Sequence, residues 1–258
     1  MMSVRPHQRI TRAIEAATGA GRVALVPFIT AGYPDRDRFV ETLRAVSGPG
    51  DVVEVGVPFS DPMADGVTIQ RSSHAAIEAG VSLHWIIEQL SAAGDTGAPI
   101  VLMSYLNPLL AYGYEKLAAD AVGAGVCGFI VPDLPLEEGA DLRAALDCQG
   151  LALIQLVTPA TPDERMRALC DASKGFVYAV TIKGITGGGQ QMPPEVTDYL
   201  DRVKSIASIP VCAGFGVREA AQVSSLGEHA DGVIVGSALV EQLEAGNAPA
   251  AFLQGLAG

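Results

Sequence analysis

Short apolar runs recur along the chain at intervals that suit alternating strands and helices. Each run is almost continuously apolar, which is typical of a parallel strand that is buried on both faces. The eight runs cover residues 23–30, 51–57, 98–105, 126–131, 151–157, 175–181, 209–214 and 231–236.

Amphipathic helical segments fill each gap between these runs, and the longest of them covers residues 68–94. Many end in Gly and several begin with Pro or Asp, which are usual stop and start signals. Eight strand–helix units in 258 residues predict an α/β fold, a (β/α)8 TIM barrel formed by one domain over residues 1–258. The basic amphipathic start of the chain predicts an extra N-terminal helix. An open, doubly wound sheet is the alternative, but "TGAGRV" precedes a strand, the wrong order for a dinucleotide-binding turn.

Composition limits the class of protein. The mean hydropathy is +0.30, yet no apolar stretch reaches the roughly 18 residues of a membrane span. The first residues lack the apolar region of a secretory signal, so we expect a cytoplasmic protein without membrane contact. A net charge of −12 disfavours nucleic acid as a partner. The four cysteines lie far apart, without a CxxC pair, and are expected to be structural thiols.

One charged residue interrupts the second apolar run, "DVVEVGV". Glu54 stands among valines, where an unpaired carboxylate costs several kcal/mol. Alternation puts it either inside the barrel or under the outer helices, and only the barrel mouth offers a substrate. No predicted strand carries an Arg or Lys to neutralise it. We therefore expect Glu54 to face the cavity with a raised pKa, suited to proton transfer near neutral pH.

A second carboxylate follows in the loop after that strand, "PFSDPMADG". Asp61 precedes Pro62, a common turn pairing, and is interpreted as structural. Asp65 precedes Gly66 and is either a plain turn residue or a partner of Glu54 in acid–base chemistry.

Glycine-rich turns follow the last three strands. Backbone N–H groups at such turns and at a helix N-terminus bind anions, and phosphate often lies after strands seven and eight of this fold. The sequence therefore predicts a phosphate site at Gly214, Gly216, Gly236 and Ser237, with Gly187 close to it.

Two other catalytic schemes find little support in the sequence. A Schiff-base aldolase needs a strand-end lysine, and only Lys183 follows a strand, in a glycine-rich loop. A metal enzyme needs clustered ligands, but the four histidines are scattered. We expect acid–base chemistry on a phosphorylated small molecule, with no cofactor and no metal.

Several segments resemble the tryptophan synthase α-subunit family, in the family's order and over nearly the whole chain. They are "LVPFITAGYPD", "EVGVPFSDPMADGVTIQ", "VPDLPLEE", "GFVYAVTIKGITG", "CAGFGV" and "VIVGSALV". The resemblance implies a TIM barrel that cleaves indole-3-glycerol phosphate to indole and glyceraldehyde 3-phosphate in tryptophan biosynthesis. It also implies a pyridoxal-phosphate β-subunit as partner, in an α2β2 heterotetramer.

The same resemblance implies roles for single residues. Glu54 would shuttle protons, and Asp65 would stabilise positive charge on the indole nitrogen. The implied substrate contacts are Phe28 and Met103 on the apolar wall, Tyr178 beside the glutamate, Thr186 against the aspartate, and Gly187, Gly216, Gly236 and Ser237 at the phosphate.

Two departures from the family pattern leave alternatives open. Val67 stands where the family usually has Pro, and three successive glycines, Gly187 to Gly189, occupy the loop after strand six. Extra glycine raises the entropy lost when a loop closes. A free-standing indole-releasing lyase, a non-catalytic α-like activating subunit and a phosphosugar isomerase or epimerase are the other hypotheses.

Overall fold

The computed structural model describes residues 4–180, 192–214 and 216–257. Its strands form one sheet in the order β5-β4-β3-β2-β1-β9-β8-β7-β6, with every pair parallel. The strands are β1 Ala24–Thr30, β2 Val53–Gly56, β3 Ile100–Met103, β4 Val126–Ile130, β5 Ala152–Ile154, β6 Leu156–Val157, β7 Val177–Val180, β8 Val211–Gly214 and β9 Gly232–Val235.

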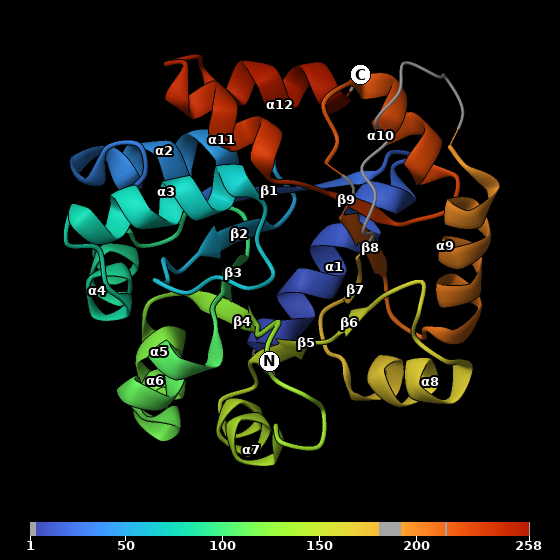
Figure 1. The fold of residues 1–258 in the computed structure, drawn as a ribbon, viewed down its shortest axis with the longest axis horizontal. Helices are drawn as coiled ribbons and strands as arrows, with labels where there is room; N and C mark the ends of the chain where they lie inside the picture. Colours follow the sequence, from blue (N-terminus) through green and yellow to red (C-terminus); the bar gives the residue numbers. More distant parts are fainter. Residues whose placement is uncertain (1–3, 181–191, 215, 258) are drawn as a thin grey trace.

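The two ends of this sheet are halves of one strand. Only Gln155 separates β5 from β6, so the sheet returns on itself as a barrel, as Figure 1 shows. The Gln155 N–H donates to Ser173 Oγ at 3.0 Å instead of to the neighbouring strand. This diversion explains why eight predicted strands appear as nine, and the predicted TIM barrel is confirmed.

Helices surround the barrel on its outside (Figure 1). They are α2 Phe39–Ser47, α3 Val67–Glu78, α4 Leu83–Ala93, α5 Leu106–Tyr112, α6 Tyr114–Gly123, α7 Ala140–Cys148, α8 Asp163–Ala172, α9 Pro194–Ile206, α10 Ala220–Gly227, α11 Ser237–Glu244 and α12 Pro249–Ala257, with a 3-10 turn at Arg36–Arg38.

Two helical segments differ from the prediction. The long segment 68–94 is divided into α3 and α4 at Gly80. Its φ of +80° lies in the left-handed region, which favours glycine, and Ser82 then caps the N-terminus of α4. The gap after β3 contains two helices, α5 and α6, where the alternation of strands and helices predicts one.

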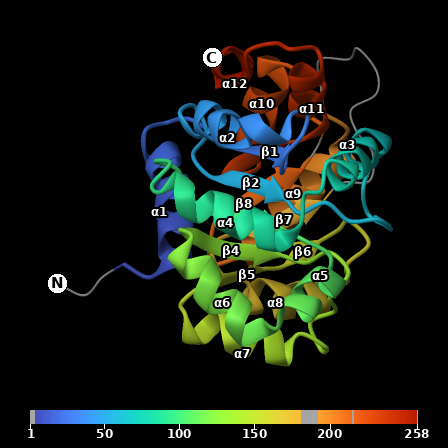
Figure 2. The ribbon, with the colours of Figure 1, turned by 90° about the vertical axis from the view of Figure 1, so that its left-hand side faces the viewer.

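The extra helix α1, Pro6–Gly19, closes the N-terminal end of the barrel (Figure 2). Ile10, Ile14 and Ala17 are fully buried against the inward-facing side chains of the strands. Two side chains fix it there: His7 Nδ1 lies 2.8 Å from the Gly150 carbonyl oxygen, and Thr11 Oγ1 donates to the Gly175 carbonyl at 2.8 Å. With this end filled, space inside the barrel is left toward the carboxyl ends of the strands.

Successive side chains along each strand point alternately into the barrel and toward the helices, which gives two hydrophobic cores. Val52 packs inside the barrel, whereas Val53 and Val55 pack against the helices. Glu54 therefore faces inward, where its Cα is in register with Phe28 on β1 and Val101 on β3.

Candidate active site

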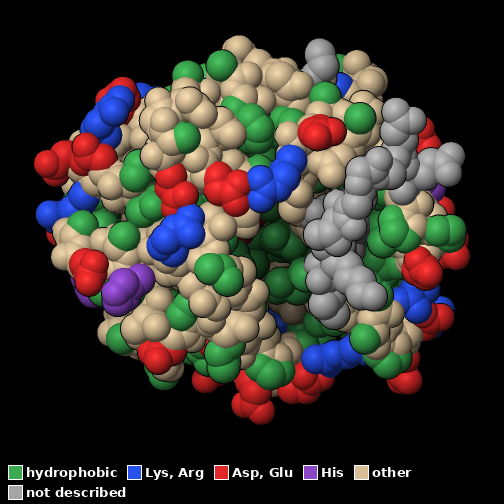
Figure 3. All heavy atoms as spheres, turned by 45° about the horizontal axis from the view of Figure 1, so that its top comes forward, with side chains coloured by type: hydrophobic (Ala, Val, Ile, Leu, Met, Phe, Trp, Pro, Cys, Tyr) green, Lys and Arg blue, Asp and Glu red, His purple; other side chains and the backbone are tan. Residues whose placement is uncertain are grey.

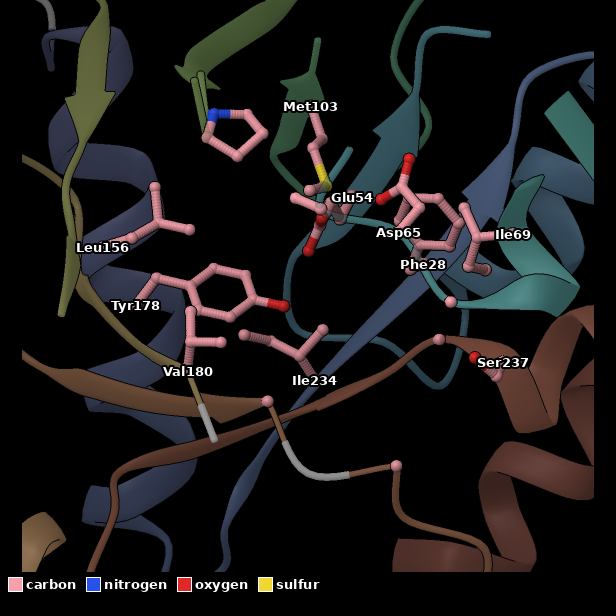
Figure 4. Close-up of a pocket in the computed structure, with 16 residues that line it drawn as sticks. Phe28, Glu54, Asp65, Ile69, Met103, Leu156, Tyr178, Val180, Ile234 and Ser237 are labelled. Carbon is pink, nitrogen blue, oxygen red and sulfur yellow. The ribbon is translucent and has the colours of Figure 1, made fainter. Parts of the chain in front are cut away.

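A cavity of about 280 Å³ opens at the carboxyl ends of the strands, and Figure 3 shows it as a hollow with an apolar floor. Side chains from most of the strands converge on it (Figure 4). Its lining is Phe28, Glu54, Ala64, Asp65, Gly66, Ile69, Met103, Pro132, Leu156, Tyr178, Val180, Gly214, Gly216, Ile234, Gly236 and Ser237.

Glu54 is the most deeply buried acid at this cavity, with 1% of its surface exposed. Neither of its carboxylate oxygens has a hydrogen-bond partner among the described residues, and no described Lys or Arg pairs with it. Burial, followed by the negative charge of Asp65, raises its pKa to about 8. Glu54 is therefore predominantly protonated at pH 7, ready to give a proton to a molecule in the cavity.

Asp65 lies beside Glu54 on the same side of the cavity, on the loop between β2 and α3 (Figure 4). Burial raises its pKa, and a hydrogen bond from the Tyr105 hydroxyl to Oδ2, at 3.2 Å, opposes that rise. The two acids therefore differ in environment, because Asp65 has a hydrogen-bond donor that Glu54 lacks within the described chain. This contrast favours ionised Asp65 beside protonated Glu54.

Tyr105 is a site residue that the sequence interpretation missed. Its hydroxyl accepts a hydrogen bond from Ala64 N at 2.8 Å while donating to Asp65, and its ring stacks on Phe59 at 4.9 Å. It thus holds the acid-bearing loop at two successive residues. The sequence did offer one indication of its role. Tyr105 is the second residue after β3, and side chains at the carboxyl ends of strands line the active site in this fold.

Tyr178 points its hydroxyl into the cavity toward Glu54 (Figure 4). Burial, followed by the charge of Glu54, raises its pKa well above its ordinary value, so the phenol stays protonated. Gly214 leaves room for this ring, because a Cβ there would come within 2.8 Å of the Tyr178 hydroxyl.

The remaining wall is apolar. Phe28, Ile69 and Met103 lie on the side of the two acids, and Leu156, Val180 and Ile234 lie around Tyr178 (Figure 4). Gly56 permits the Phe28 ring to fold over β2, since a Cβ there would come within 2.5 Å of the ring.

Three of the predicted phosphate-binding residues meet at one edge of the cavity. Gly216 has φ +61°, and Gly236 and Ser237 begin α11. The first N–H groups of a helix have no acceptor within the helix, so they can bind an anion. Gly214 also lines the cavity. Thr186 and Gly187 lie outside the described residues, as do Lys183, Gly188 and Gly189.

Comparison with known sequences identifies the family of this chain. The family model described as "Tryptophan synthase alpha chain" matches residues 14–255. The chain belongs to this tryptophan synthase alpha chain family. A relative from Nitratidesulfovibrio vulgaris Hildenborough, named tryptophan synthase alpha chain, is 48% identical over 248 residues, covering 95% of this chain and 96% of that one.

Solved structures agree with this membership of the tryptophan synthase alpha chain family. A Mycobacterium tuberculosis tryptophan synthase has a TM-score of 0.89 and 38% identity, covering 96% of each chain. A tryptophan synthase complex from Pyrococcus furiosus has a TM-score of 0.82 and 34% identity, covering 91% of this chain and 98% of that one. The predicted family, the lyase class and the role in tryptophan biosynthesis are confirmed.

Within the parts of the chain that the structure describes, no group of three His, Cys, Asp or Glu side chains could hold a metal ion. None of the described helices is both long and apolar enough to span a membrane.

Proposed function

We propose that Glu54 is the proton donor and acceptor, and Asp65 the electrostatic partner, for cleavage of indole-3-glycerol phosphate. One observation carries the assignment: a buried carboxyl group without a partner in the described chain faces an apolar cavity, beside a second acid held by a tyrosine. Burying a carboxyl group without a partner costs free energy, and such groups are typical of functional sites.

The proposed reaction begins with the protonated form of Glu54. It gives its proton to C3 of the indole, which places positive charge on the ring nitrogen, and the Asp65 carboxylate accepts a hydrogen bond from that N–H. The Glu54 carboxylate then removes the proton of the glycerol hydroxyl next to the breaking bond. The C3–carbon bond breaks, its electron pair returns to the indole ring, and the hydroxyl carbon becomes the aldehyde of glyceraldehyde 3-phosphate.

This sequence of steps balances protons within the site. Glu54 ends in the state in which it began, because the proton given to C3 is replaced by the one taken from the hydroxyl. The apolar wall would hold the indole ring, and the Gly216, Gly236 and Ser237 edge would hold the phosphate, which the acidic protein must bind through local donors.

The partner is part of this proposal. Related structures are tryptophan synthase complexes, and we infer a β-subunit docked on the face that carries the cavity, in an α2β2 assembly. Met63 and Val67 on the loop and first turn after β2 are 82% and 76% exposed, and Leu110 on α5 is also exposed. Such apolar side chains near the mouth are suited to an interface. A cytoplasmic location and one domain over residues 1–258 complete the proposal.

Steady-state indole release from indole-3-glycerol phosphate, with and without a β-subunit, tests these assignments. We expect slow turnover alone, faster turnover with the partner, and loss of most turnover in Asp65→Asn while substrate still binds. Equal rates with and without the partner would indicate a free-standing lyase. No indole under either condition, with partner binding retained, would indicate a non-catalytic activating subunit.

A further inference from the structure

Two acidic side chains one turn apart on α11 bind arginines from different parts of the chain. Glu241 accepts two hydrogen bonds from the Arg218 guanidinium, at 2.6 and 3.0 Å. Glu244 accepts from Arg71 of α3 at 2.7 Å to each oxygen, and from the Tyr33 hydroxyl at 2.6 Å. Figure 3 shows acidic and basic side chains side by side along one edge of the hollow.

The Glu241 partners come from the segments that carry the cavity edge. Arg218 follows Gly216 by two residues, in the turn between β8 and α10. Glu241 follows Ser237 by one helical turn. Thr68 follows Asp65 by three residues, and its hydroxyl lies 3.4 Å from Glu241 Oε1. One carboxylate thus connects the Gly216 turn, the start of α11 and the beginning of α3.

We propose that Glu241 is a positioning residue for the phosphate of the substrate. It acts by holding the Gly216 turn at a fixed place against the N-terminus of α11. A two-pronged arginine–carboxylate pair fixes orientation as well as distance. Backbone donors on two separate segments can bind one phosphate only when those segments keep the right separation. This inference rests on the proposed phosphate site.

The degree of exposure indicates the size of the effect. The side chains of Arg218 and Glu241 are 57% and 34% exposed, so solvent screens their attraction and their contribution to overall stability is small. We therefore expect a change in phosphate affinity of about three- to fivefold, the range that an exposed pair of good geometry supports.

A different role for Arg218 would reverse the sign of the effect. If Arg218 itself were available to bind phosphate and Glu241 merely restrained it, removing the Glu241 charge would release the cation and tighten phosphate binding. The positioning role predicts the opposite result, because both partners are needed to hold the turn.

The test uses Glu241→Gln, Arg218→Met and their double variant in the full chain. Three quantities are measured: KM and kcat for indole-3-glycerol phosphate with the β-subunit, and the dissociation constant of inorganic phosphate from the phosphate-dependent rise in Tm. We expect KM and the dissociation constant to rise about three- to fivefold in each single variant, with kcat within about twofold of the parent. The double variant should be no weaker than either single variant.

Two further variants sharpen the comparison. Glu41→Gln breaks another arginine–carboxylate pair with two hydrogen bonds, from Arg38 at 2.7 and 3.0 Å, at a place that does not line the cavity, and should change neither constant. Glu241→Arg combined with Arg218→Glu exchanges the two charges and restores an ion pair between the same positions. This double variant should recover the affinity for phosphate, which would not happen if the single variants had failed to fold.

Unchanged constants in both single variants, or tighter phosphate binding in Glu241→Gln, would overturn the positioning role. Failure of the parent to release indole would instead contradict the proposed function, while the phosphate constants still decide the role of Glu241.

Discussion

The Tyr105 hydroxyl donates a hydrogen bond to Oδ2 of Asp65 at 3.2 Å, although the two residues are forty positions apart in the chain. It connects the end of β3 to the loop that follows β2, and through that loop it sets the environment of one of the two acids at the cavity. The effect on Asp65 opposes the pKa rise that burial causes.

Replacing Tyr105 by Phe should lower kcat about tenfold, because a hydrogen bond to a charged group is worth about 1.5–3 kcal/mol. The pKa of Asp65 should rise further, which moves the acidic limb of the pH–rate profile upward. Tyr112→Phe removes a similar tyrosine–aspartate bond, to Asp120 at 2.8 Å, on residues that do not line the cavity, and should leave the profile unchanged. Identical profiles for both variants and the parent would argue against this role for Tyr105.

Glu54→Gln should keep the fold and reduce turnover by about 10²–10⁴-fold, because an amide of the same shape transfers no proton. In the parent, kcat/KM should fall as the pH rises through about 8, where Glu54 loses the proton that starts the reaction. Steady-state indole release across pH measures both effects. Turnover of Glu54→Gln within a few-fold of the parent would remove Glu54 from the mechanism.

Stability should also depend on the ionisation of Glu54. Below pH 4.5 the Glu54 carboxyl is protonated in both the folded and the unfolded protein. Between about pH 4.5 and 8 only the folded protein keeps this proton. Unfolding then releases a proton, so the free energy of unfolding falls as the pH rises through this window and levels off above it. Each pKa unit corresponds to about 1.4 kcal/mol, so the total loss is several kcal/mol.

Glu54→Gln isolates this effect, because Asp65 contributes a loss of the same sign in both proteins. Urea unfolding at pH 5 and pH 8 should show that the variant loses less stability than the parent over that interval. An equal loss in the two proteins would mean that Glu54 ionises normally in the folded state.

Gly216→Ala should weaken phosphate and substrate binding without blocking the cavity. Gly216 has φ +61°, and no heavy atom of the residues that the structure describes lies within 4 Å of the position a Cβ would take there, so among these residues the substitution strains the backbone only. We expect KM to rise about fivefold, with a stability loss of about 1 kcal/mol. Gly246→Ala is the control, since Gly246 has φ +72°, equally open space and no part in the cavity lining. Gly246→Ala should lose as much stability as Gly216→Ala, but its KM should stay at the value of the parent.

The pattern of apolar runs and the size of the chain were sufficient to predict the barrel. Alternation alone left two directions for Glu54, and the inward one was predicted because only the barrel mouth offers a substrate. The break at Gln155 could not be predicted, because its cause is a hydrogen bond to Ser173, eighteen residues away. Likewise α5 was missed because "NPLL" carries turn and helix signals together.

The two acids were recognisable as candidates because charge is rare among apolar strands. The raised pKa of Glu54 was predicted, because no predicted strand carries an Arg or Lys to neutralise it. The environment of Asp65 was not predictable, since it depends on Tyr105, forty residues away in the chain. The arginine–carboxylate pairs on α11 were missed for a related reason. Arg218 and Glu241 are twenty-three residues apart, and nothing in their local sequence shows that they meet.

The helix that closes the bottom of the barrel has a consequence for how the chain is made. During synthesis α1 leaves the ribosome first, yet Ile10 and Ile14 are buried against strands that are made much later, and Thr11 binds the carbonyl of Gly175. The first helix therefore cannot complete its packing until about two-thirds of the chain has emerged, and part of its apolar face lacks its final partners until then. Its docking is a late event that completes the barrel from below, and a chain that stalls before residue 175 exposes this face to aggregation or to a chaperone.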